Sequence, residues 1–259
     1  MPVGAGPQPA GRRYPRRVHV IRALACSAAL VGLLGACGAP DHRFVKASPT
    51  LQYQVQVGNQ EVPVPVKAAT TFFRLPRGYT TIDEARAYDR AGALDSLTPV
   101  EQVRVLQKQE LIVFDGAPDP DPLHFFSRTA SAPVGLQLTL ALSDQERDTV
   151  SLSTLRNYIF DIDADLSSLR PGAEPPEDPP KVDIIGRDDE VVRDGGLRGH
   201  RIRYTIQGDG GGSFAVDQTV LIDERSRVLY AFLVGCDVVC FGRHQDVVED
   251  IVSSWTIKD

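Results

Sequence analysis

The sequence predicts an α+β domain in which a central antiparallel sheet is covered by helices. Three strands follow one another in hairpin order near the C-terminus, where antiparallel pairing is the default. Helical segments are few and are separated from these strands, which favours α+β over a parallel α/β sheet. The hydrophobic share of 42% and the charged share of 24% are ordinary for a globular protein of 259 residues.

The first 36 residues predict a secretory signal. Arginines crowd residues 12–22, and no acidic residue precedes Cys37. The apolar run 23–36 is too short for a transmembrane helix, which needs about 20 residues, and it has the length of a signal-peptide hydrophobic region. The run ends in Leu34-Gly35-Ala36-Cys37. This motif resembles the bacterial lipobox, with glycine in place of the commoner alanine or serine.

The lipobox resemblance implies that Cys37 is the lipidation site. In that family of signals the thiol receives a diacylglycerol, and cleavage occurs just before the cysteine. The alternative is an ordinary cleaved signal followed by an unrelated cysteine. Lipidation implies a protein on the extracytoplasmic face of the cell membrane, with the membrane as its first partner. The export route, Sec or twin-arginine, stays open.

Three segments are expected along the chain. Residues 1–36 form the lipoprotein signal peptide, residues 37–64 a lipid-anchored tether and first strand, and residues 65–259 the folded domain. The tether itself is expected over residues 38–50. Removing the leader removes five arginines and takes the net charge from −6 to −11. An acidic mature chain has no general attraction for nucleic acid, which we therefore exclude as a partner.

Local patterns predict the elements of the domain in order. Alternating apolar and polar residues indicate strands, and apolar residues three and four apart indicate helices. A Pro-rich loop is expected over residues 170–180. Strands are expected at residues 51–57, 71–75, 111–114, 134–142, 200–206, 214–222 and 228–234. Helices are expected over residues 100–109, over a segment with Leu152, Leu155, Ile159 and Ile162 on one face, and over residues 243–255.

Two of the four cysteines are expected to form a disulfide. Cys26 lies in the leader and Cys37 is the lipid acceptor, which leaves Cys236 and Cys240. Two cysteines in an oxidising compartment read as one bridge. Bridged Cα atoms lie about 4.4–6.8 Å apart, whereas four residues of strand span about 13 Å, so the segment must turn. A redox or metal-binding pair that includes His244 is the alternative.

The two ends of the domain resemble PsbP-like domains. Residues Phe73-Arg74-Leu75-Pro76-Arg77-Gly78-Tyr79 are similar to their Phe-x-x-Pro-x-Gly-(Trp/Tyr) start. The hydrophobic strand, short turn and terminal helix that finishes in Ser253-Ser254-Trp255-Thr256-Ile257 are similar to their end. The resemblance covers about residues 65–258 and includes actinobacterial surface lipoproteins with a disulfide before the last helix. It implies an α/β/α sandwich and no catalytic residues.

No catalytic, metal or cofactor site is predicted. The stretch 161–165 resembles the start of a calcium loop but lacks the later glycine and glutamate. Asp115, Asp119, Asp121 and His124 share a Pro-rich loop, which is more simply a solvated turn than a metal site. Ser213 follows two glycines but lacks the second glycine of a nucleophile elbow.

The sequence therefore predicts a non-enzymatic binding or accessory domain at the cell envelope. Its further partner would be an unknown envelope protein or cell-wall ligand. Two alternatives stay open. An envelope hydrolase would show a cleft with converging carboxylates of perturbed pKa, and a lipid carrier would show a large cavity lined by Leu, Val and Phe. A filled core with an exposed groove would favour binding.

Overall fold

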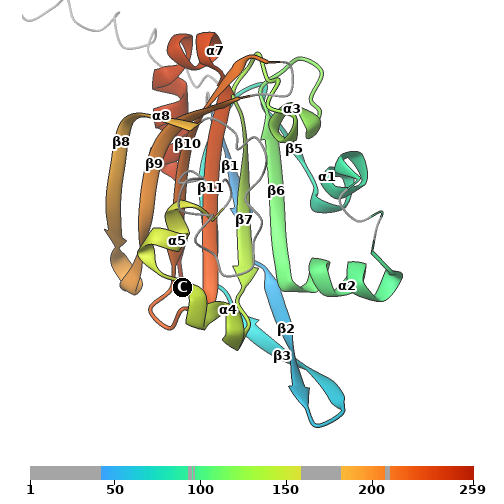
Figure 1. Cartoon of the computed structure of the whole chain (residues 1–259). Coiled ribbons are helices and arrows are strands. Elements are labelled where there is room, and N and C mark those ends of the chain that lie inside the picture. The colour runs from blue at the N-terminus through green and yellow to red at the C-terminus, as the bar shows by residue number, and fades with distance from the viewer. Residues whose placement is uncertain (1–41, 93–94, 96, 159–181, 208–210) are drawn as a thin grey trace, which may run out of the picture. The chain divides into compact units, whose positions relative to one another are not determined.

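A seven-stranded antiparallel sheet organises the part of the chain that the computed structural model describes, residues 42–92, 95, 97–158, 182–207 and 211–259 (Figure 1). Its strand order is β5-β6-β7-β11-β10-β9-β8. The predicted α+β class with a central antiparallel sheet is confirmed. The strands are β5 (Thr80–Ile82), β6 (Gln109–Asp115), β7 (Val134–Ala141), β8 (Val182–Arg193), β9 (Leu197–Gln207), β10 (Ser213–Ile222) and β11 (Val228–Asp237).

The central strands β10 and β11 are buried along nearly their whole length, so both faces of the sheet are covered. Their side chains alternate between the two faces. On one face Gln218 donates to the carbonyl of Arg156 at the end of α5 (Leu152–Arg156), 2.9 Å away. The other face packs against α8 (Gln245–Ser254).

A three-stranded sheet in the order β1-β4-β12 adds to the cover on the α8 side. It consists of β1 (His42–Ala47), β4 (Thr70–Pro76) and β12 (Thr256–Lys258). The ring of Phe73 on β4 lies 5.0 Å from that of Phe232 on β11, which joins the two sheets. The expected tether over residues 38–50 is therefore wrong from His42 onward, because those residues pair with β4.

The hairpin of β2 (Thr50–Val57) and β3 (Gln60–Lys67) projects from this body (Figure 1). Gly58 closes its turn with a φ of +61°, which glycine adopts at little cost. Strand β3 was not expected, because Pro63 and Pro65 remove two backbone donors. It forms nevertheless, since it pairs with β2 alone and needs no second partner.

Besides α8, the described residues contain six helices: α1 (Glu84–Ala91), α2 (Pro99–Lys108), α3 (Leu123–Phe126), α4 (Asp144–Thr149), α5 and α7 (Val238–Arg243). The predicted opening of α2 by Pro99 is confirmed, and Thr98 and Glu101 form a capping box there. The helix expected over 243–255 is confirmed as α8, which begins two residues later, at Gln245; the short helix α7 before it was not expected. None of the described helices is long and apolar enough to cross a membrane.

Several expectations fall outside the described residues. Cys37, the calcium-like stretch 161–165 and the Pro-rich loop 170–180 are among them, as are Ile159 and Ile162 of the expected helix. The described residues from His42 to Asp259 belong to one compact unit. Hairpin β2–β3 therefore belongs to the same unit as the main sheet.

Candidate functional site

A groove of about 1180 Å³ lies where β8 turns into β9 and β10 turns into β11. We call it the terminal groove, because the last residues of the chain form one of its walls. Four separate segments contribute to it, so only the tertiary fold brings them together. Its lining residues are Pro65, Val66, Lys67, Ala69, Arg193, Asp194, Gly195, Leu197, Asp223, Glu224, Arg225, Arg227, Tyr230, Ser253, Trp255, Thr256, Ile257, Lys258 and Asp259.

Trp255, the chain's single tryptophan, is fixed in the wall of the terminal groove. Helix α8 ends at Ser254, and the Trp255 ring stacks on Phe232 of β11 at 5.2 Å and 13°. The side chain is only 1% exposed. Its indole Nε1 is buried and has no acceptor among the described residues. An unsatisfied buried donor of this kind calls for an explanation, such as a water or a ligand.

Arg193, the last residue of β8, lies over the Trp255 ring, with its guanidinium carbon 5.0 Å from the ring centroid. Its Nη1 donates to the Trp255 carbonyl at 2.9 Å. Within the described residues no carboxylate pairs with it. Burial and the nearby charge of Arg201 lower the pKa of Arg193. The groove therefore holds a half-buried cation that lacks a counter-charge.

Tyr230 on β11 adds a third polar group to the same wall. Its hydroxyl accepts a hydrogen bond from the backbone N–H of Ala69 at 2.8 Å. Because a phenol oxygen both accepts and donates, its O–H remains to be donated. Burial raises the pKa of Tyr230 to about 12, so the hydroxyl keeps its proton at neutral pH.

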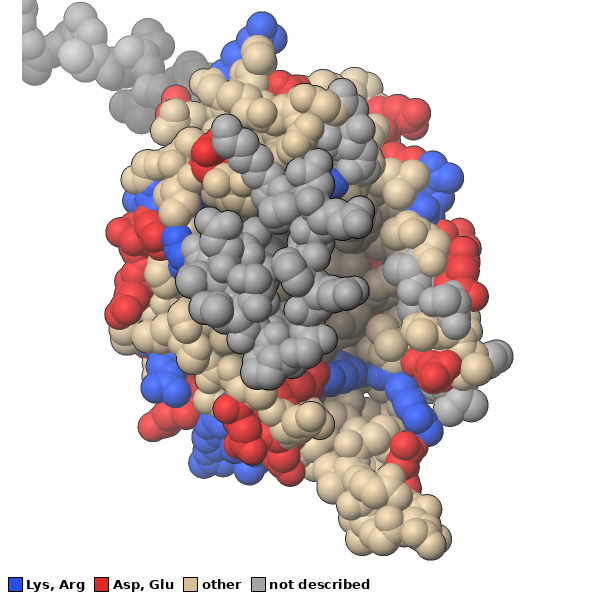
Figure 2. All heavy atoms as spheres, viewed as in Figure 1, with Lys and Arg blue, Asp and Glu red and all other residues tan. Residues whose placement is uncertain are grey.

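The rim of the terminal groove is charged with both signs. Asp223 begins the β10–β11 turn, and its Oδ1 accepts from the backbone N–H groups of Arg227 at 2.5 Å and Val228 at 2.9 Å. Glu224, Arg225 and Arg227 follow on the same turn, and Lys67 and Lys258 lie at the other edge. Figure 2 shows that cations and anions are also interspersed over the visible face of the molecule.

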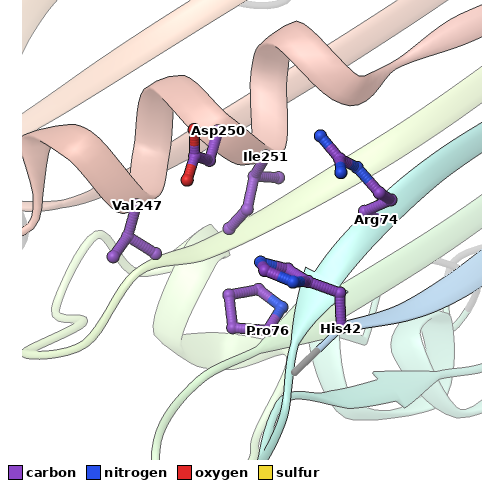
Figure 3. Close-up of a pocket in the computed structure, with 6 residues that line it drawn as sticks. All are labelled: His42, Arg74, Pro76, Val247, Asp250 and Ile251. Atoms are coloured by element: carbon purple, nitrogen blue, oxygen red, sulfur yellow. The ribbon is translucent and has the colours of Figure 1, made fainter. Parts of the chain in front are cut away.

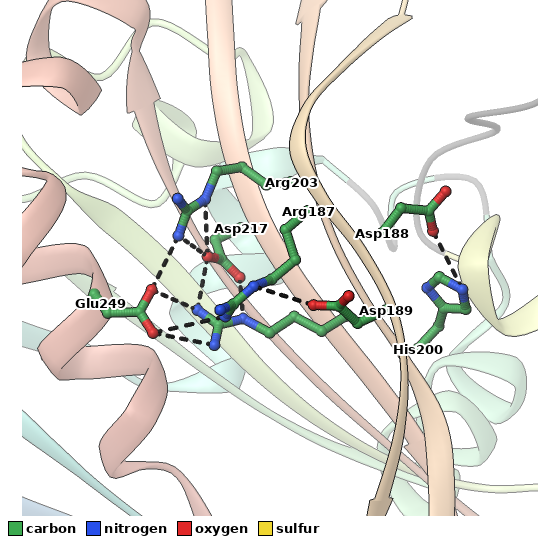
Figure 4. A network of polar contacts seen from close by, with 8 residues as sticks. Arg187, Asp188, Asp189, His200, Arg203, Asp217 and Glu249 are labelled. Carbon is green, nitrogen blue, oxygen red and sulfur yellow. Dashed lines mark hydrogen bonds and ion pairs between the residues drawn. The ribbon is translucent and has the colours of Figure 1, made fainter.

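A dense ion network lies beyond the groove, between the sheet and α8 (Figure 4). The carboxylate of Asp217 on β10 is fully buried between two arginines of β9, Arg201 at 2.8 Å and Arg203 at 2.6 Å. Glu249 on α8 contacts the same two arginines at 2.9 and 3.0 Å. Every charge in this core is paired: Asp217 joins β10 to β9, and Glu249 extends the pairing to α8.

Three of the four candidate residues in the Pro-rich loop, Asp115, Asp121 and His124, are hydrogen-bonded to one another. His124 Nδ1 lies 2.7 Å from the Oδ2 of buried Asp115, which also accepts from the backbone N–H groups of Ala117 and Asp121. Asp121 in turn pairs with Arg90 on α1. No group of three metal-binding side chains occurs among the described residues. The loop is thus held by hydrogen bonds around Asp115.

Two glutamates meet between α1 and β6. Burial raises the pKa of Glu84 to about 7, and the charge of Glu110 adds to this shift. Burial also raises the pKa of Glu110. A hydrogen bond from the Leu111 backbone and one with Tyr88 act in the opposite direction on Glu84. Neither glutamate lines the terminal groove.

A smaller pocket of about 250 Å³ lies where β1 begins (Figure 3). Side chains from β1, β4 and α8 surround it: His42, Arg74, Pro76, Val247, Asp250 and Ile251. Its volume falls below the range of about 300–1,000 Å³ that ligand pockets occupy. Because His42 is the first described residue, this pocket marks the end of the sheet from which the chain runs back toward Cys37.

Cys236 and Cys240 are joined by a disulfide, with Cα atoms 5.9 Å apart. The turn that the spacing requires is the junction of β11 and α7, where Asp237 accepts from the backbone N–H groups of Val239 and Cys240. His244 Nδ1 lies 3.8 Å from the Cys240 sulfur. Since that sulfur is bonded to Cys236, it is not a thiolate that could bind a metal.

Comparison with known proteins finds similarity in structure alone. No protein-family model and no curated protein matches the chain. The solution structure of cyanobacterial PsbP from Synechocystis sp. PCC 6803 shares 11% identity over 87% of this chain and 99% of that one, with a TM-score of 0.40. LpqN of Mycobacterium tuberculosis, described as involved in cell envelope biogenesis, shares 13% identity over 83% and 92%, with a TM-score of 0.38.

A third similar structure is the Ran-binding protein Mog1p of Saccharomyces cerevisiae. It shares 12% identity over 81% of this chain and 97% of that one, with a TM-score of 0.36. Similarities of this size assign no ligand and no activity. The α+β class stated above rests on the strands and helices of the chain itself.

Proposed function

We propose that the chain is an extracytoplasmic lipoprotein that acts as a non-enzymatic binding domain, with the terminal groove as its ligand site. The observation that carries this proposal is the place of the groove. It adjoins the Thr70 end of β4, where β12 pairs, whereas β1 begins beside Pro76 at the other end. At about 3.3 Å per residue, the two ends of β4 lie about 20 Å apart.

If the chain is anchored through Cys37, this separation would keep the terminal groove away from the membrane. The stretch from Cys37 to His42 reaches about 17 Å at most. A tether of that length holds the His42 end of the domain near the bilayer. The terminal groove, at the opposite end of β4, then faces away from the membrane and toward the cell wall. An unidentified envelope protein or cell-wall molecule is the ligand class that this geometry favours.

The anchor is tested by mass spectrometry of the membrane fraction of cells that make the full chain. An acylated cysteine as the first residue, corresponding to Cys37, is the expected result. Cys37→Ala should release the protein from the membrane or stall its processing. Wild-type protein that leaves the cell intact and without acyl chains would contradict the anchor.

The groove is tested with a photo-crosslinking amino acid in living cells. Placed at Arg225, on the rim of the groove, it should give a defined adduct with an envelope component. Placed at Asn59, at the exposed tip of the β2–β3 hairpin, it serves as the control. Equal adducts from both positions, or none from Arg225, would count against the groove as the ligand site.

An envelope hydrolase is the second candidate, and one observation favours it. Glu84 and Glu110 are neighbouring carboxylates, and the pKa of Glu84, raised to about 7, suits a general acid. Incubation of the full chain with purified cell wall, followed by chromatography of soluble fragments, decides between the two. Fragment release that Glu84→Gln abolishes would replace the binding proposal with a hydrolase.

A further inference from the structure

We infer that the terminal groove binds an anionic oxygen group, a carboxylate or a phosphate, through Arg193, Tyr230 and Trp255. This inference rests on the proposed function, because it names the chemistry of the ligand that the groove would hold. Three polar groups of the inner wall support this inference. Each is a hydrogen-bond donor, and each carries at least one N–H or O–H group that has no acceptor among the described residues.

Arg193 supplies the charge. One guanidinium N–H donates to the Trp255 carbonyl at 2.9 Å, and the guanidinium carbon lies over the indole ring, 5.0 Å from its centroid. The remaining N–H groups have no carboxylate partner in the described part of the chain. A planar guanidinium presents paired donors that match the two oxygens of a carboxylate or phosphate.

Trp255 and Tyr230 supply neutral donors beside it. The Trp255 ring stacks on Phe232, and Tyr230 lies two residues before Phe232 on the same face of β11. The buried indole Nε1 of Trp255 is unsatisfied, and the Tyr230 oxygen already accepts from Ala69. Three donors side by side are complementary to a group that only accepts, which is an ionised oxyanion.

The size of the groove indicates more than a free ion. A volume of about 1180 Å³ exceeds what a single carboxylate or phosphate fills. The rim carries acidic as well as basic side chains, so a strongly polyanionic ligand would meet repulsion from Asp194, Glu224 and Asp259. The ligand class is therefore a larger molecule with one terminal or isolated anionic group.

The single tryptophan gives a direct readout. The full chain, purified in detergent, is titrated at constant ionic strength while the indole N–H resonance is followed by NMR and the emission by fluorescence. One arm uses N-acetyl-dialanine, which carries a peptide carboxylate, and the other uses glycerol 3-phosphate. A saturable shift of the indole resonance in at least one arm is expected, and the stronger arm identifies the source of the oxyanion.

Three substitutions assign the shift to this wall. Arg193→Gln should weaken binding by about tenfold to a hundredfold, the range for a hydrogen bond to a charged group. Arg193→Lys should keep part of the affinity, and Tyr230→Phe should weaken it less than Arg193→Gln. Arg198→Gln is the matched control, because Arg198 is exposed on β9 and does not line the groove. Circular dichroism checks that each variant is folded.

Two outcomes would overturn the inference: no saturable shift in either arm, or equal affinity of Arg193→Gln and Arg198→Gln. Failure here is distinguishable from failure of the proposed function. Crosslinking at Arg225 in cells without any anion binding would leave a groove that takes a neutral ligand. Anion binding without crosslinking at Arg225 would leave an oxyanion site but remove the groove's proposed cellular role.

Discussion

Three arginines lie on the same face of β8 and β9, but two are paired with carboxylates and one is not. Arg201 and Arg203 share a fully buried aspartate, Asp217, and a glutamate from α8. Arg193 lies over the indole ring of Trp255 and donates to the Trp255 carbonyl, and no carboxylate among the described residues pairs with it. The difference separates a charge that stabilises the fold from one that is available to a ligand. A paired buried charge fixes one element to another, whereas an unpaired one is kept at a cost and is a candidate for binding.

The largest expected effect tests the paired region. Asp217→Asn keeps the shape of the side chain but leaves two arginines side by side without their buried counter-charge. We expect a loss of about 3–5 kcal/mol in the free energy of unfolding, as for a broken buried ion pair. Urea denaturation followed by circular dichroism measures it.

Glu249→Gln is the control for this prediction. Its side chain is 43% exposed, so water replaces much of what the arginines lose. The expected loss is at most about 1 kcal/mol. A stability of Asp217→Asn that equals that of the wild type would mean that the buried ion pairs between β9 and β10 do not stabilise the domain.

A smaller effect on stability is expected at Glu84, a carboxylate with no cation beside it among the described residues. The pKa of Glu84 is raised from 4.5 to about 7, so the folded protein holds this proton more tightly than the unfolded chain does. The associated stability is present below about pH 4.5 and is lost as the pH rises to about 7. Because Glu84 is partly exposed, we expect Glu84→Gln to be more stable than the wild type by only about 1 kcal/mol at pH 8.

Thermal melts of Glu84→Gln and wild type from pH 4 to pH 8 check the sign. The two curves should coincide at pH 4 and separate between about pH 4.5 and pH 7. Asp83→Asn is the matched control, because Asp83 caps the same helix but is exposed. A wild type that gains stability relative to Glu84→Gln as the pH rises would contradict the raised pKa.

The smallest expected change in stability belongs to the unpaired arginine. Arg193→Gln loses its stacking on Trp255, which contributes about 0.5–1 kcal/mol, but it also relieves the desolvation of an unpaired cation. The two effects oppose each other, so the net change in unfolding free energy should stay within about 0.5 kcal/mol. Urea denaturation beside Asp217→Asn measures the contrast. A loss as large as that of Asp217→Asn would make Arg193 a structural residue.

Much of the fold could be predicted because its signals are local. The alternation at residues 200–206 predicted β9, the glycine turn after it predicted β10 as its hairpin partner, and Pro99 marked the start of α2. Strand β8 was not expected, since its charged residues and Gly186 hide the alternation. The pairing of β8 with β9 is also irregular, because the register shifts at a β-bulge between Ile184 and Arg187.

The candidate site could not be predicted, because its parts are distant in the sequence. Arg193 and Trp255 are 62 residues apart, and Ala69 and Tyr230 are 161 apart. A tryptophan in an apolar helix face indicates burial, and that much of the terminal segment was expected. Nothing in the local pattern of either residue indicates that an arginine will stack on that ring.

The sequence by itself determined the antiparallel hairpins, the turn that Cys236 and Cys240 require, and the helical composition of the C-terminus. These follow from backbone preferences and side-chain periodicity over a few residues. Only the tertiary structure decided that β1 and β12 both pair with β4, that Asp217 lies between two arginines, and that Arg193 has no carboxylate partner among the described residues. The physical reason is that ion pairing and desolvation depend on which distant groups meet, and a short stretch of sequence does not contain that information.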